Sequence, residues 1–130
     1  MDVDEEGTTE QSKERKEKRR FPRSFMDLPI EYRVMNVPRP HGGVVINGSE
    51  RGLLIHSVKD MPVGTKLNIA VLFPAGFQLT NFEVLAEVLR KDLCLEEDWQ
   101  GFEYGLRFIQ IKEEDTQKLV QLLRKRFRSK

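Results

Sequence analysis

The chain has 130 residues, 38% of them hydrophobic, and a formal net charge of +1, which suits one modest globular domain with a single core. Its one cysteine, Cys94, excludes an intramolecular disulfide, and with only two histidines the chain lacks an obvious ligand set for zinc. No apolar run approaches the roughly 18 residues of a membrane span, so we expect a cytoplasmic protein without a metal site or membrane insertion.

The first 18 residues differ from the rest of the chain. They hold no large apolar side chain beyond Met1 and Val3, and such a segment cannot bury enough surface to offset the entropy lost on ordering. We therefore predict a disordered, charged N-terminal arm over residues 1–18 and a single folded domain over residues 19–130.

Alternating apolar and polar residues predict six short strands in the folded part. The alternation is clearest in the first of them, where Leu28, Ile30, Tyr32 and Val34 are apolar. The six predicted strands cover residues 28–34, 44–46, 53–55 and beyond, 67–73, 82–88 (with a start as early as Phe77) and 102–108. The acidic stretch 91–100 between the last two is predicted to be a loop.

The end of the chain changes from the period of a strand to that of a helix. Large apolar residues fall at helical spacing from Leu119 to Phe127, with acidic residues at 113–115 before them and Arg and Lys after them. This polarity suits the helix dipole. Six short strands followed by one helix predict a small, mainly β fold: a six-stranded antiparallel barrel with a C-terminal α-helix.

Two polar signatures flank the predicted strands at 28–34 and 44–46. The first places Arg19 and Arg23 four residues apart, with Pro22 restraining the segment between them. A guanidinium offers paired donors that match phosphate oxygens or the edge of guanine. In a segment so rich in arginine the same spacing also occurs at Arg15 and Arg19, so its register is open.

The second signature is Asn47-Gly48-Ser49-Glu50-Arg51-Gly52, an NxSxxG pattern before an apolar run. Asn47 offers donors and an acceptor, Ser49 a hydroxyl for a phosphate or for the turn itself, and Gly52 permits close backbone approach or a positive φ. Because Asn-Gly is also a strong hairpin signal, a plain turn is the competing interpretation.

Together the two signatures resemble the PilZ domain family, whose pattern is RxxxR before the first strand and D/NxSxxG at the opening of the third. The stretch from Tyr104 to Ile109 is also similar to the last strand of that family, and the likeness covers roughly residues 17–127. The resemblance implies a six-stranded barrel with a helix that binds the bacterial second messenger cyclic di-GMP. One departure is Gly48, where the family usually has an apolar residue.

The resemblance also implies a role for each residue of the two signatures. Arg19 and Arg23 would hold guanine edges and phosphates, with Arg20 as an additional cation. Asn47 would read the base, Ser49 would contact the ligand near its phosphate or sugar, and Gly52 would let the backbone turn beneath it. Lys18, just before the arginines, is a candidate for setting how many ligand molecules bind.

The leading hypothesis is a cyclic di-GMP receptor that needs no cofactor. Ligand binding would order the basic arm and change the binding of an effector protein. Two alternatives stay open: a small barrel that binds single-stranded nucleic acid, which we rank lower, and a PilZ-like interaction module that binds no nucleotide. An enzyme is not expected, because no pair of carboxylates or nucleophile–base set stands out.

Three further residues have structural interpretations. Trp99, within the predicted loop, is expected to fold onto its own domain rather than to anchor a partner. Arg107, on the last strand, is expected to be an outward-facing surface residue. His56, on the third strand, is expected to be structural.

Overall fold

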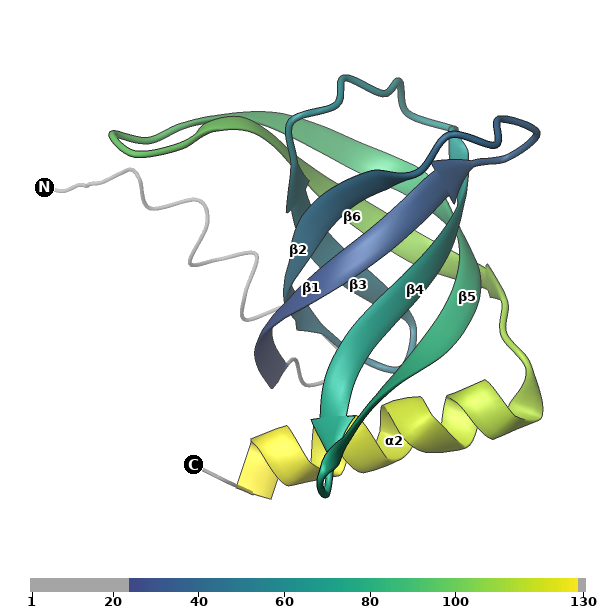
Figure 1. The fold of residues 1–130 in the computed structure, drawn as a ribbon. Helices are drawn as coiled ribbons and strands as arrows, with labels where there is room; N and C mark the ends of the chain where they lie inside the picture. Colours follow the sequence, from purple (N-terminus) through teal and green to yellow (C-terminus); the bar gives the residue numbers. More distant parts are fainter. Residues whose placement is uncertain (1–23, 129–130) are drawn as a thin grey trace, which may run out of the picture.

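A computed structural model describes residues 24–128 as a closed six-stranded barrel with one helix at one end (Figure 1). The elements are β1 (Ser24–Val34), β2 (His41–Gly48), β3 (Gly52–Ser57), β4 (Lys66–Ala75), β5 (Gln78–Leu95), β6 (Gln100–Gln110) and α2 (Glu113–Arg128). The strands follow the order β1-β2-β3-β6-β5-β4 around the ring, and every pair is antiparallel. The predicted fold class is confirmed, whereas the predicted disordered arm at 1–18 lies outside the described residues.

The alternation of apolar residues fills the barrel interior. Successive side chains of a strand point to opposite faces, and the apolar positions of each strand are those that turn inward. On β4 and β5, for example, the side chains with at most 7% exposure are Leu67, Ile69, Val71, Phe73, Phe82, Val84, Ala86 and Val88. Burial of this apolar surface is the main contribution to the stability of the barrel.

Helix α2 covers the end of the barrel at which β1 begins and β6 ends (Figure 1). Its first turn carries the acidic residues Glu113, Glu114 and Asp115, which interact favourably with the positive end of the helix dipole. Leu119 and Leu122 are 1% and 5% exposed and pack into the core. The helix therefore closes the apolar interior at this end.

The opposite end is closed by the loop between β3 and β4. Met61 in this loop is buried, and its backbone N–H donates to the hydroxyl of Tyr104 at 2.8 Å. That hydroxyl donates to the carbonyl oxygen of Lys59 at 2.5 Å. Nearby, the Tyr32 hydroxyl is 2.5 Å from that of Ser57. Both tyrosines thus place a polar group at the rim of the barrel while their rings fill its interior.

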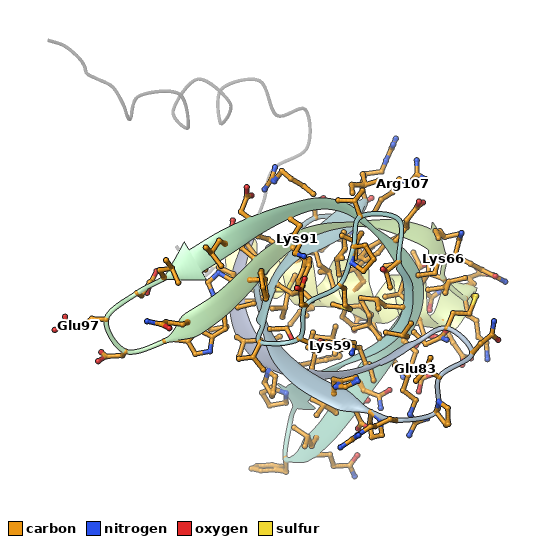
Figure 2. All side chains as sticks on the ribbon, turned by 90° about the horizontal axis from the view of Figure 1, so that it is seen from above. Lys59, Lys66, Glu83, Lys91, Glu97 and Arg107 are labelled. Carbon is orange, nitrogen blue, oxygen red and sulfur yellow. The ribbon has the colours of Figure 1, made fainter. Side chains whose placement is uncertain are left out.

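The prediction of a loop over residues 91–100 is wrong. Strand β5 runs on to Leu95 and β6 begins at Gln100, so that the two form a long hairpin with Glu97 at its tip, well outside the barrel (Figure 2). The acidic residues that suggested a loop are exposed, and pairing with β6 keeps the chain extended. The acidic composition alone does not reveal that hairpin pairing.

The prediction that Trp99 folds onto its own domain is confirmed, and Trp99 lies next to the tip of this hairpin. The indole of Trp99 stacks on the imidazole of His56, with ring centroids 5.0 Å apart and planes at 12°. The imidazole is also bound at its edge, where the Glu103 carboxylate lies 3.1 Å from His56 Nε2. Trp99 thus packs against its own domain.

Candidate functional site

The NxSxxG signature forms a tight turn between β2 and β3. The N–H of Ser49 donates to the carbonyl oxygen of Gly52 at 3.0 Å, and the N–H of Arg51 donates to the Ser49 hydroxyl at 3.2 Å. The carbonyl oxygen of Arg51 accepts from the N–H of Phe108 at 2.9 Å, which ties the turn to β6. Of the two roles considered for Ser49, stabilising the turn is therefore the one seen in the structure.

Gly52 is explained by close approach of two backbones. A Cβ atom at this position would overlap the carbonyl oxygen of Leu106 and lie 3.1 Å from its carbonyl carbon. Gly52 is paired with Arg107 on β6, so only a residue without a side chain lets β3 start this near β6. A positive φ, the other reason considered, is not involved.

The space that a side chain at position 48 would need is filled by Leu53 and Met26. A Cβ atom here would lie 2.6 Å from Cδ2 of Leu53 and 3.0 Å from Cε of Met26. Leu53 is 0% exposed and Met26 is 1% exposed. The departure from the usual family pattern thus coincides with a local core that Leu53 and Met26 already fill.

Asn47 lies at an irregular place in the sheet. The register of β2 shifts relative to β3 between Val45 and Asn47, and that of β1 shifts between Phe25 and Leu28. Bulges of this kind bend a strand and redirect its side chains. Asn47 and Ser49 are both buried, with exposed fractions of 9% and 4%, so the turn offers a ligand only a small part of their surface.

The start of β1 lies beside this turn. Ser24 is paired with Gly48, and Phe25 with Asn47, so the chain enters the barrel next to the NxSxxG signature. The four predicted cations Lys18, Arg19, Arg20 and Arg23 lie outside the described residues, and their roles stay predictions. The structure thus places Asn47, Ser49 and Gly52 together and fixes the point to which the arginine segment is joined.

Two cations that the motif does not specify flank the turn. Arg51 lies in the turn itself and is exposed. Arg107 lies opposite Gly52 on β6 and points outward, as predicted, with Nη2 2.8 Å from the Glu87 carboxylate. No sequence signal pointed to Arg51, which occupies a variable position of the NxSxxG pattern. Among the described residues, no group of three or more His, Cys, Asp or Glu is arranged to hold a metal ion.

Comparison with known protein families agrees with this arrangement. A sequence model of the PilZ domain matches residues 17–125, which is most of the chain. The chain belongs to the PilZ domain family. The PilZ family is a family of cyclic di-GMP receptors, and its domains are generally binding or adaptor modules rather than enzymes. A search of curated proteins gave no significant match to this PilZ domain.

Two solved structures have a similar fold. The first is the inhibitor of motility MotI/DgrA from Bacillus subtilis, with a TM-score of 0.70 and 18% identity over 87% of this chain. The match covers 52% of MotI/DgrA, so this PilZ protein spans about half its length. The second is the PilZ domain of YcgR from Escherichia coli, solved with c-di-GMP, with a TM-score of 0.64 and 13% identity over 86% of this chain and 93% of that one.

Within the described part of this PilZ protein, no helix is both long and apolar enough to cross a membrane.

Proposed function

We propose that this PilZ domain is a receptor that binds cyclic di-GMP between the arginine segment before β1 and the turn that joins β2 to β3. The pairing of Ser24 with Gly48 is the observation that supports it most. Five residues of chain span at most about 17 Å. Arg23 and Arg19, which precede Ser24 by one and five residues, are therefore within reach of a ligand placed on the turn.

The turn supplies the rigid side of the proposed site. The Ser49 hydroxyl accepts a hydrogen bond from the Arg51 N–H and keeps its own hydrogen, which a phosphate oxygen of the ligand would accept. Asn47 would bond the edge of a guanine at its small exposed surface. Gly52 acts indirectly, because its close approach to β6 holds the turn in place.

The arginine segment supplies the charged side of the proposed site. Arg19 and Arg23 would bind the phosphates and the guanine edges as bidentate donors, and Arg20 would add positive charge. Lys18 would favour a second, stacked ligand molecule by offsetting its negative charge. The same fold in the PilZ domain of YcgR was solved with c-di-GMP, which supports the ligand but not the individual roles.

Binding would also produce the signal. A dianionic ligand that draws Arg19 and Arg23 onto the turn brings the arm to the side of the barrel, and the surface around β1 changes with it. An effector protein that recognises this surface would respond to the ligand. The chain would then act as an adaptor that couples the ligand to this effector.

Isothermal titration of the full chain with cyclic di-GMP tests the proposal. We expect one or two ligands per chain and a dissociation constant in the micromolar range or below. Absence of heat at a ligand concentration of about 100 μM, far weaker than an ordinary nucleotide site, would contradict it. Tighter binding of labelled single-stranded DNA than of cyclic di-GMP would instead favour the nucleic-acid alternative.

Matched arginine variants locate the site and settle its register. Arg23→Ala should weaken binding at least tenfold, which corresponds to about 1.4 kcal/mol, as should Arg19→Ala. Arg15→Ala is the control, because the same change in charge at Arg15 should alter the affinity less than threefold. Equal losses in Arg15→Ala and Arg23→Ala would show a diffuse electrostatic effect instead of a defined site.

A further inference from the structure

One edge of β5 has no neighbouring strand among the described elements. The ladder between β4 and β5 ends at the pair Lys66 and Glu87, and the loop before β4 continues it only as far as Val88, through hydrogen bonds of 2.8 and 2.9 Å. Beyond this point β5 pairs with β6 alone. Residues 89–95 therefore form an open edge on the hairpin that leaves the barrel (Figure 1).

The charged side chains that could protect this edge are engaged within the chain, and Arg90 Nε lies 3.3 Å from the Asp92 carboxylate. Natural edges are blocked by prolines or by charged side chains that repel another strand. Here Leu93 and Leu95 are each 64% exposed. The ammonium group of Lys91 is occupied elsewhere, in an ion pair with Asp60 and 4.8 Å from the ring centroid of Phe102. In Figure 2 Lys91 lies over the mouth of the barrel and not at the hairpin tip.

The charges along the edge are complementary to those of a second, antiparallel copy of the same edge. The tip of the hairpin carries the exposed acidic residues Glu96, Glu97 and Asp98, and the base of the open edge carries Arg90. Two such edges in antiparallel orientation bring each acidic tip to the other's basic end. We propose that two copies of the chain pair edge to edge along residues 90–96, the end of β5 and the first residue after it, as an antiparallel, two-fold symmetric dimer.

The charges also select the register. Centred on Leu93, the pairing sets Leu93 against Leu93 of the second copy and Arg90 against Glu96 of the second copy. Like charges directly opposite each other destabilise a sheet. Centring on Asp92 opposes two carboxylates, and centring on Cys94 sets Asp92 against Glu96. Centring on residue 91 opposes two lysines, and on residue 95 sets Asp92 against Asp98. Of these five registers only the one at Leu93 avoids every such pair.

The geometry predicts a weak, closed assembly. An interface of about seven residues per strand is small, and small interfaces belong to transient complexes, so we expect a dissociation constant of roughly 10 to 200 μM. Because the same surface is used on both copies, the contact closes at the dimer and does not propagate into fibres. The dimer requires no nucleotide and is independent of the function proposed above.

Cysteine cross-linking tests the register directly. Opposed residues in an antiparallel pair have Cα atoms about 4.5 to 5.5 Å apart, within reach of a disulfide. The full chain carrying Leu93→Cys with Cys94→Ser should therefore form a covalent dimer on mild oxidation. The control is Leu89→Cys with Cys94→Ser. In this register its two cysteines are about 27 Å apart along the strands, and it should stay monomeric.

Analytical ultracentrifugation tests the association without cross-links. The full chain should show a monomer–dimer equilibrium that Arg90→Glu weakens at least fivefold and that Arg90→Glu combined with Glu96→Arg restores. Leu93→Lys should abolish the dimer. It should leave the thermal midpoint of unfolding unchanged, because Leu93 is exposed. A monomeric chain at 500 μM, equal cross-linking at positions 89 and 93, or no restoration by the charge exchange would each overturn the proposal.

Discussion

The carbonyl oxygen of Leu106 occupies the space that a Cβ atom at Gly52 would need. Both partners in this contact belong to backbone, so a larger residue at 52 has to push β3 away from β6. We expect Gly52→Ala to lower the unfolding free energy by about 3 kcal/mol and the thermal midpoint by about 10 to 15 °C. Urea titration followed by circular dichroism measures the first, and a thermal scan the second.

Gly42 provides the control for this change. A Cβ atom there would lie 4.0 Å from the nearest atom, the carbonyl oxygen of Ile30, so alanine fits without strain. Because glycine weakens a strand relative to alanine, Gly42→Ala should leave the stability unchanged or raise it by up to about 1 kcal/mol. Equal losses at positions 42 and 52 would argue against the close approach as the reason for Gly52.

The space above Gly48 predicts a coupling between positions 48 and 53. A Cβ at 48 would meet Cδ2 of Leu53 at 2.6 Å, and Leu53→Val removes that atom. We expect each single change, Gly48→Ala or Leu53→Val, to cost about 1 to 2 kcal/mol. The double variant should lose at least about 1 kcal/mol less than the sum. Urea titrations of the four proteins give this coupling energy, and additive losses would contradict the packing seen here.

The barrel itself was predictable because the apolar alternation in each strand reports directly on which side faces the core. Leu67, Ile69, Val71 and Phe73 show the pattern and are all buried. The extension of β5 to Leu95 was not predictable in this way, because its side chains lie outside the barrel and do not alternate between core and solvent. Its extended form depends on pairing with β6 across the tight turn at residues 96–99.

The site was predictable in part for a similar reason. The turn depends on local chemistry, in which Ser49 bonds the backbone two residues ahead, and this kind of turn is visible in the sequence. The reason for Gly52 lies in its distance from Leu106, and the filling of the space at Gly48 depends on Met26, 22 residues earlier. Contacts between strands decide these points, and no local pattern encodes them.

Trp99 is expected to stabilise the outer part of the hairpin by anchoring its turn to β3. Its ring stacks on His56 and lies so close to Gly101 that a Cβ there would be 2.6 Å from the indole. Trp99→Ala should therefore lower the unfolding free energy by about 1 kcal/mol and speed hydrogen exchange at residues 93–96. Phe77→Ala is the control, because Phe77 is fully exposed at a turn and should affect neither quantity. Unchanged exchange in Trp99→Ala would show that strand pairing alone holds the hairpin.

Alkaline pH should weaken the barrel through its two tyrosines. Burial raises the pKa of Tyr104 and that of Tyr32 above the ordinary value of 10.0. The folded state therefore keeps these protons to higher pH than the unfolded state does. The stability they confer is fully present below pH 10 and falls as pH rises through the folded pKa values, by at most about 1.4 kcal/mol per pH unit for each tyrosine.

Phenylalanine substitutions separate this effect from that of other groups that titrate at high pH. Tyr32→Phe and Tyr104→Phe each remove one titrating group, so the decline in unfolding free energy between pH 9 and 11 should be shallower in both variants than in the unchanged chain. At pH 7 Tyr104→Phe should also cost about 1 to 3 kcal/mol, because Met61 N–H and Lys59 C=O lose their partner. Urea titrations across this pH range measure both effects, and an identical pH slope in all three proteins would mean that lysine titration, not the buried hydroxyls, causes the alkaline loss.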